Sequence, residues 1–175
     1  LSFGTYYWVE TAAPTGYVLP TGSAAYSAAQ VIDATYAKAG NTAVLTVKDP
    51  QVTSGLTVKK VDDKTGAPLA GAKFALYKGT PPTSGTPTGT EIDECTTTLP
   101  SGTCSLSGLA FGSYYWYEVS APTGYDLPAN RFSAAIVLSS ANAGTTLPPT
   151  EFRDPQKNTS LKVKKVDLTT KAVLG

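Results

Sequence analysis

The sequence predicts an all-β protein built from tandem β-sandwich repeats. Short stretches rich in Tyr, Val and Thr alternate apolar and polar residues, which is typical of strands. The 175 residues include 16 Gly and 13 Pro, so turns are frequent, and the 41% of hydrophobic residues is enough for a packed core. Near-identical segments recur about a hundred residues apart. A period this long indicates whole domains in tandem and not a solenoid of small units.

Three pairs of similar segments define the repeat. The pairs are residues 3–17 and 111–125, residues 56–62 and 161–167, and residues 47–51 and 152–156. The first pair aligns without a gap and is offset by 108 residues, whereas the other two are offset by 105. The first copy therefore carries three extra residues before its final strand.

This register divides the chain into three parts. Residues 1–50 are expected to be the C-terminal part of one repeat, residues 56–155 a complete repeat, and residues 160–175 the first strand of the next. Short polar linkers at 51–55 and 156–160 would join them like beads on a string. Since the chain has neither an initiator Met nor a signal peptide, we expect it to be a piece of a longer protein.

Alternation and turn residues place the strands of the complete repeat. The expected strands are residues 56–61, 72–77, 114–119, 134–139 and 151–154. Asp-Asp-Lys-Thr-Gly at 62–66 favours a turn, and residues 79–90, rich in Pro, Gly and Thr, favour a long loop. No stretch is convincingly helical, although the Ala-rich residues 23–37 are ambiguous.

Three ionisable residues lie on strand faces that should point into the core. Lys60, Glu118 and Asp154 each share a strand face with the apolar residue two positions earlier. Burying an unpaired charge costs on the order of several kcal/mol. Three interpretations follow. The three residues form a buried ion network, or the strand faces that carry them do not face the core, or their side chains react with one another. The same positions in the partial repeats are Glu10, Asp49 and Lys165.

The segments that carry these residues resemble a known family. Lys-Lys-Val-Asp ends the strand at 56–62, the run Gly-Ala-Pro-Leu-Ala-Gly-Ala-Lys-Phe-Ala-Leu-Tyr follows at 66–77, and Glu-Val-Ser-Ala-Pro-Thr-Gly-Tyr lies at 118–125. Together they are similar to the B-type repeat of Gram-positive collagen adhesins (CnaB), also called the SpaA-type prealbumin-like pilin domain. The resemblance covers nearly the whole chain and implies a Greek-key, prealbumin-like β-sandwich. In that family the last of these runs is called the E-box.

The resemblance also implies an isopeptide bond between Lys60 and Asp154, assisted by the E-box Glu118. Asp stands where many members have Asn, so the leaving group is water instead of ammonia. Burial disfavours charged forms, so a buried lysine amine can be neutral and nucleophilic, and a buried aspartic acid can stay protonated. A neighbouring glutamate can polarise the carbonyl and move protons. Lys59 is a rival amine, but its position on the strand faces solvent.

The two cysteines, Cys95 and Cys104, flank a turn-rich stretch. Their spacing predicts a local disulfide that closes a hairpin, which requires an oxidising compartment. The alternative is a pair of reduced thiols in a cytosolic domain.

The composition argues against several classes of function. The net charge of +1 speaks against nucleic-acid binding and against a polybasic membrane patch. No apolar run approaches the roughly 18 residues of a membrane span. The absence of His removes Ser-His-Asp and Cys-His catalysis and speaks against a zinc site. We therefore expect no metal and no cofactor. We also expect that the protein is not an enzyme, because self-crosslinking is a single event without turnover.

Two classes of function remain. The first is a crosslinked stalk or fibre module of a bacterial cell-surface adhesin or pilus, anchored to the cell wall through parts outside this chain. The second is an adhesin domain that contacts a host protein or glycan, for which the aromatic residues near Trp116 would be a platform. Alternation instead places Trp116 in the core and only Tyr115 and Tyr117 at the surface. Near-duplicate repeats, low charge and no evident pocket favour the stalk.

The partial repeats also predict head-to-tail self-assembly. Residues 1–50 contain Glu10 and Asp49 without a first-strand lysine, and residues 160–175 offer Lys165 on the matching strand. An unpaired strand edge favours the addition of such a strand from a neighbouring molecule. Repeated exchange need not close and would make a fibre, covalent if Lys165 bonds to Asp49. The alternative is that the two ends only reflect where a longer protein was cut.

Overall fold

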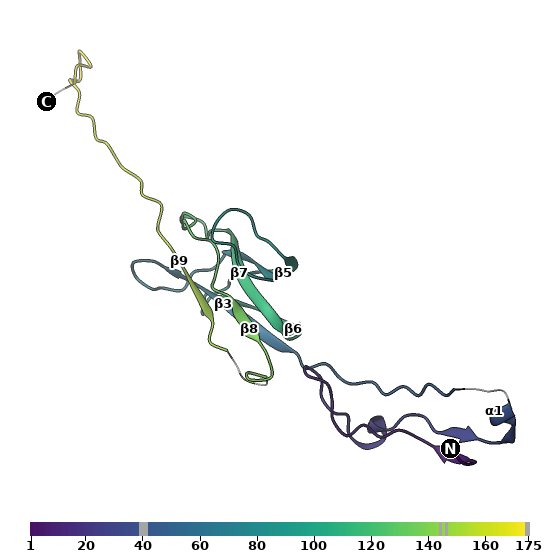
Figure 1. Cartoon of the computed structure of the whole chain (residues 1–175). Coiled ribbons are helices and arrows are strands. Elements are labelled where there is room, and N and C mark those ends of the chain that lie inside the picture. The colour runs from purple at the N-terminus through teal and green to yellow at the C-terminus, as the bar shows by residue number, and fades with distance from the viewer. Residues whose placement is uncertain (39–41, 144, 146, 174–175) are drawn as a thin grey trace.

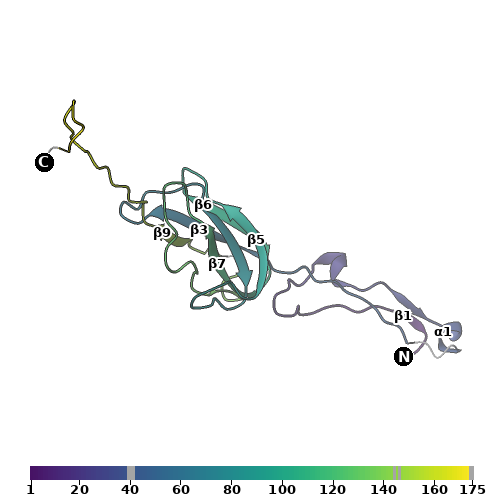
Figure 2. The same cartoon turned by 90° about the horizontal axis from the view of Figure 1, so that it is seen from above.

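The computed structural model describes residues 1–38, 42–143, 145 and 147–173 (Figure 1). We distinguish a front segment (residues 1–50), a central domain (residues 54–154) and a tail (residues 160–173). The front segment and the tail leave the central domain at opposite ends, as two perpendicular views agree (Figures 1 and 2). The described part of the chain is therefore elongated.

The central domain is a sandwich of two β-sheets, as the sequence predicts. One sheet has the order β6-β3-β9 and is made of β3 (Ser54–Asp62), β6 (Thr103–Leu109) and β9 (Thr150–Asp154). The other has the order β5-β4-β7-β8 and is made of β4 (Lys73–Lys78), β5 (Thr90–Thr96), β7 (Gly112–Ser120) and β8 (Ile136–Leu138). The first and last strands, β3 and β9, are parallel neighbours, whereas the other pairs are antiparallel. The first and last strands of the domain therefore lie side by side in one sheet, and because they are parallel the chain enters and leaves the domain at opposite ends.

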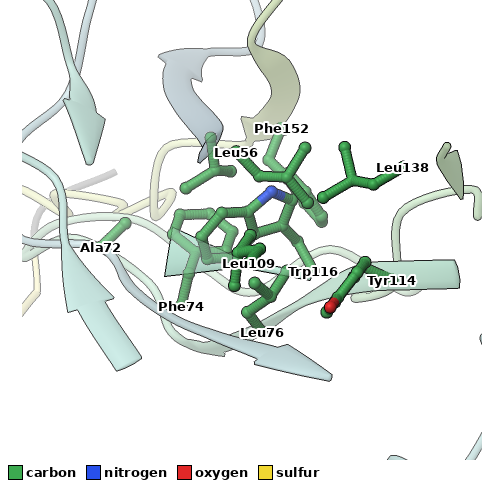
Figure 3. Packing of buried hydrophobic residues seen from close by; sticks show 10 residues of the cluster. Leu56, Ala72, Phe74, Leu76, Leu109, Tyr114, Trp116, Leu138 and Phe152 are labelled. Carbon is green, nitrogen blue, oxygen red and sulfur yellow. The ribbon is translucent and has the colours of Figure 1, made fainter. Parts of the chain in front are cut away.

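The hydrophobic core fills the space between the sheets (Figure 3). Trp116 of β7 is fully buried there, and Phe74 of β4 meets it edge-on with 6.4 Å between ring centroids. Phe74 also packs against Phe152 of β9 at 4.9 Å, which joins the two sheets. The core residues are Leu56, Val58, Ala72, Phe74, Leu76, Leu109, Tyr114, Trp116, Leu138 and Phe152. Every strand that the sequence predicts contributes to this set.

The cysteine pair forms a disulfide, as predicted, and an antiparallel bridge between Thr98 and Thr103 closes the turn between the two cysteines. Cys95 lies in β5 and Cys104 in β6, with 5.9 Å between their Cα atoms. These strands are edge strands of different sheets, so the bond joins the two layers of the sandwich. The bond therefore encloses a short bridged turn, as expected, but this turn also carries the chain from one sheet to the other. Neither β5 nor β6 was among the strands expected from alternation.

Tyr115 departs from the exposure expected from strand parity. Its side chain is fully buried although it points away from the core between the sheets. The Pro- and Thr-rich loop before β5 covers it, because the Tyr115 hydroxyl accepts a hydrogen bond from Thr88 N at 2.8 Å and donates one to Thr88 O. Tyr77 stacks on the same ring at 5.5 Å between centroids. The loop is thus a fixed part of the outer face, which alternation could not reveal.

The front segment contains β1 (Gly4–Tyr6), the 3-10 helix η1 (Gly22–Ala25), β2 (Gln30–Ile32) and α1 (Ala34–Lys38). β1 and β2 pair antiparallel, as β7 and β8 do in the central domain. The Ala-rich stretch that was ambiguous in the sequence therefore holds a 3-10 turn and a helix of five residues. Among the described residues, no helix has the length and apolar character needed to cross a membrane.

Candidate crosslinking site

Lys60, Glu118 and Asp154 come from three different strands and meet inside the sandwich. Each of the three is 0% exposed. In the parallel β3–β9 pair, Lys60 lies opposite Phe152, so Asp154 lies two residues further along the same face of β9. Glu118 belongs to β7 and reaches this point from the opposite sheet. The fold thus brings two carboxyl groups to one lysine amine in a space from which water is excluded.

The lysine amine contacts both carboxyls. Lys60 Nζ donates a hydrogen bond to Glu118 Oε2 at 3.0 Å and another to Asp154 Oδ1, which is its nearest contact. Nζ also lies 5.8 Å from the centre of the Phe152 ring, which covers one side of the amine. The nucleophile, the carboxyl that it would attack and a third group able to exchange protons are therefore already in place.

Glu118 has the electrostatic character of a general acid–base group. Burial raises the pKa of Glu118 to about 7; Lys60 opposes this rise and the charge of Asp154 adds to it. A carboxyl with a pKa near neutrality can both accept and release a proton at neutral pH. Among the described residues, neither Asp154 Oδ2 nor Glu118 Oε1 accepts a hydrogen bond, although Glu118 Oε1 lies 3.0 Å from Lys60 Nζ. One proton held between the two carboxyls would satisfy both oxygens.

This arrangement can support amide formation between Lys60 and Asp154. The two reacting groups are in contact, so no encounter in solution is needed. Complete burial excludes water from the amine and from the carboxyl. Since amide formation expels water, a dry site also favours the product.

The other lysines and acids named in the sequence analysis lie elsewhere. The Lys59 side chain is 37% exposed and faces Glu151 at 3.9 Å, outside the core. In the front segment, the neighbouring Asp49 carboxyl raises the pKa of Glu10. Lys165 is exposed on the tail, at the opposite end of the chain (Figure 1). No group of three or more His, Cys, Asp or Glu within the described ranges is arranged to hold a metal ion.

One further residue beside the site was not identified from the sequence. Asp62, at the end of β3, is 2% exposed and accepts hydrogen bonds from Thr65 N at 2.7 Å, Tyr125 Oη at 2.9 Å and Gln156 Nε2 at 2.9 Å. These bonds, led by that from Thr65 N, hold the pKa of Asp62 well below its usual value. Asp62 thereby ties the end of β3 to the E-box turn and to the linker after β9. The signal for it was the recurrence of Asp, Tyr and Gln at matching positions of the repeat.

The central domain is a two-sheet sandwich with parallel first and last strands, and it encloses a buried lysine and two acids. These features define a prealbumin-like domain. The family model described as "SpaA: Prealbumin-like fold domain" matches residues 54–147. The chain belongs to this family, and the resemblance inferred from its sequence is confirmed.

Several solved structures are similar to this chain. The Bacillus anthracis TIE protein is 25% identical with a TM-score of 0.62, over 89% of this chain and 26% of that protein. The full-length major pilin SpaD from Corynebacterium diphtheriae is 25% identical with a TM-score of 0.48, over 61% and 31%. The group B streptococcus pilus 2b backbone protein is 23% identical with a TM-score of 0.46, over 75% and 48%. This chain thus spans about a quarter to a half of their lengths. No curated protein matches its sequence significantly.

Proposed function

We propose that this chain is a structural stalk or fibre module of a Gram-positive surface adhesin or pilus, and that an isopeptide bond between Lys60 Nζ and Asp154 Cγ closes its central domain. The observation that carries the proposal is the direct contact of the fully buried amine with the Asp154 carboxyl beside Glu118. Membership of the prealbumin-like family supports the structural role, and its presence at the bacterial surface follows from that role.

The reaction needs only these three side chains. The neutral Lys60 amine attacks Cγ of the protonated Asp154 carboxyl, and the Glu118 carboxylate takes a proton from Nζ as the C–N bond forms. Glu118 then gives this proton to the departing hydroxyl, which leaves as water when the C–O bond breaks. Glu118 ends in the state in which it began. Because each domain reacts once, the process is a self-modification without turnover.

The position of the bond suits a module that carries tension. Force reaches the central domain through β3, which follows the front segment, and leaves through β9, which precedes the tail (Figure 1). The bond would join these neighbouring strands directly, so that tension passes from β3 to β9 without loading the rest of the sandwich.

The bond would also stabilise the domain against unfolding. It would close a span of 94 residues. By analogy with a disulfide across a loop of that length, restricting the unfolded chain would contribute roughly 4–5 kcal/mol. That is a large share of the 5–15 kcal/mol that holds a typical domain folded.

Protease digestion followed by tandem mass spectrometry tests the proposal. We expect one branched peptide in which Lys60 is joined to Asp154 with the loss of water. Lys59→Arg is the matched control, because it changes the adjacent, outward-facing lysine and should keep the branched peptide. Lys60→Arg should remove it. Recovery of separate linear peptides containing an unmodified Lys60 and an unmodified Asp154 would overturn the proposal.

A further inference from the structure

Arg131 holds the main chain of β7 at the point where Glu118 enters the core. We propose that Arg131 is a positioning residue for the crosslinking reaction, because its guanidinium fixes the backbone of Glu118 and Val119 and so directs the Glu118 carboxyl toward Lys60. This inference rests on the bond proposed for the central domain. It adds a residue that acts through Glu118 and not on the reacting atoms.

Glu118 lies at an irregular point of its strand. In the β4–β7 pair, Phe74 lies opposite Glu118 but Lys73 lies opposite Ser120, so the pairing skips Val119. Such a β-bulge leaves one residue unpaired and changes the direction of nearby side chains. Pairing with β4 alone therefore does not fix the direction in which the Glu118 carboxyl points.

On its other side, β7 passes from a regular neighbour to an irregular one before it reaches Glu118. β8 pairs with β7 at residues 112–114. Closer to Glu118, the neighbour of β7 is the segment 131–133, which lies outside the named strands. Glu118 N donates a hydrogen bond to Arg131 O at 2.9 Å. In a regular antiparallel pair, a backbone N–H would return a second bond to Glu118 O.

The Arg131 side chain supplies this second bond and one more. Its Nε donates to Glu118 O at 2.8 Å, and its Nη2 donates to Val119 O at 2.7 Å. Arg131 thus accepts one hydrogen bond through its backbone, returns the other through its side chain, and also binds the carbonyl of the bulged residue. Three hydrogen bonds from one residue therefore fix the main chain before and after the Glu118 side chain.

The guanidinium is itself held in place. Its Cζ atom lies 4.4 Å from the centre of the Tyr117 ring, which is a cation–π contact. Tyr117 packs in turn against the buried Phe132, with 5.0 Å between ring centroids. Since arginine presents its donors in a planar, rigid fork, a stacked guanidinium can bind two adjacent carbonyls with little freedom to turn. Arg131 acts from the outer face of the sheet, whereas the neighbouring Glu118 side chain points into the core.

Bond formation depends on where the Glu118 carboxyl lies. Lys60 and Asp154 are brought together by β3 and β9 of one sheet, whereas Glu118 reaches them from the other sheet. Glu118 Oε2 lies 3.0 Å from Lys60 Nζ, within the range that proton transfer requires. A displacement of about 1 Å can slow such a step by about 100-fold. Loosening the backbone at the bulge should therefore slow the reaction while the β3–β9 contact and the core stay in place.

The test separates the rate of crosslinking from the rate of folding. The whole chain is made in a cell-free system during a short pulse, and samples are taken at intervals. The intact mass after reduction and denaturation reports the fraction that has lost one water, and resistance to a protease reports the fraction that has folded. Arg131→Met keeps an unbranched side chain but removes the donors and the charge. It should slow crosslinking of the folded chain by about 10- to 100-fold, with no change in the rate at which protease resistance appears.

Two further variants show whether the hydrogen bonds of Arg131 are responsible. Arg131→Lys keeps a positive charge and one donor group, so it should restore part of the rate. Arg153→Met changes the other arginine of the chain, which contacts Glu151 at 2.6 Å outside the core. This control should crosslink at the wild-type rate.

Crosslinking of Arg131→Met at the wild-type rate would overturn the proposal. A delay in crosslinking that only equals a delay in protease resistance would also overturn it, because the role of Arg131 would then be structural. Should Arg131→Met never become protease resistant, the folded Arg131→Lys chain replaces it: slower crosslinking supports the proposal, and the wild-type rate overturns it. A wild-type chain that folds without losing water would contradict the proposed bond itself, which is distinguishable from a failure of Arg131 alone.

Discussion

Lys60 differs from the surface lysines in its surroundings and not in the proximity of a carboxylate. Lys73 Nζ lies 2.6 Å from Glu94 Oε2, but their side chains are 44% and 34% exposed. Water there stabilises both charges, and such a pair stays an ion pair that contributes little to stability. Around Lys60 the side chains of all three groups are completely buried, so water is excluded from the site of the proposed condensation.

Glu118→Gln should prevent the bond while leaving the fold intact, because glutamine has nearly the same volume but cannot take up the proton. The loss of roughly 4–5 kcal/mol would lower the melting temperature of the central domain by roughly 15 °C or more. Calorimetry together with the mass of each sample measures both effects. Glu151→Gln, which changes an exposed carboxylate, should retain the bond and the melting temperature. A crosslinked Glu118→Gln protein would refute the role given to Glu118.

Asp62→Asn should lower the free energy of unfolding by an amount that depends on pH. The folded-state pKa of Asp62 is lowered mainly by the hydrogen bond from Thr65 N, so its ionised form is the one that the fold stabilises. This contribution is present in full above the unfolded-state value of 3.8 and is lost as the pH falls towards the lower folded-state value. Urea unfolding from pH 7 to pH 2 should show a difference between wild type and Asp62→Asn that shrinks below about pH 4. Asp63→Asn, an exposed neighbour, should show no such trend.

At the scale of elements, the pairing of β3 with β9 organises the site. It places the lysine of the first strand beside the aspartate of the last, across 94 residues of sequence. Because the two strands are parallel neighbours, the proposed bond would join the first strand of the domain directly to the last. The disulfide between β5 and β6 plays a complementary part, because it fastens the two sheets at the edge where these strands lie.

Alternation along single strands was enough to predict the inward faces of Lys60, Glu118 and Asp154, because a strand has a period of two wherever it lies. The same rule failed for Tyr115, which is buried by a loop that no strand pattern describes. It also missed the hydrogen bonds of Asp62, whose partners Tyr125 and Gln156 are far away in sequence. Contacts made by loops and turns depend on tertiary structure, which a one-strand pattern does not contain.

Removal of the disulfide should cost less than removal of the isopeptide bond. The cysteines are only nine residues apart, so cross-linking them restricts the unfolded chain by roughly 2.5 kcal/mol. We expect the double variant Cys95→Ser/Cys104→Ser to stay folded and crosslinked, with a smaller fall in melting temperature than Glu118→Gln. A larger fall than that of Glu118→Gln, measured by calorimetry under identical conditions, would contradict this ranking.

At the scale of the whole molecule, the chain is an elongated series of units with its ends far apart (Figure 1). Backbone hydrogen bonds hold the linkers on both sides of the central domain. Lys157 N donates to Gly124 O at 2.9 Å after the domain, and Val52 N donates to Gly16 O at 2.8 Å before it. Each linker is therefore paired with the turn that ends in the E-box tyrosine. A row of stiffened, crosslinked modules of this kind would keep its length under load.

Single-molecule stretching between the chain ends, under reducing conditions, should show no unfolding step from the 94 residues enclosed by the bond in wild type. Lys60→Arg should add a step of roughly 300 Å, the length of the released chain at about 3.4 Å per residue. The Lys59→Arg control should behave as wild type. A wild-type trace with the long step would show that the strands are not joined.

The most direct test of the central claim is the intact mass of the purified chain after reduction and denaturation. The account predicts a monomer lighter than the sequence mass by one water, and a Lys60→Arg monomer with no deficit. A wild-type monomer at the full sequence mass would contradict the claim that Lys60 and Asp154 are joined.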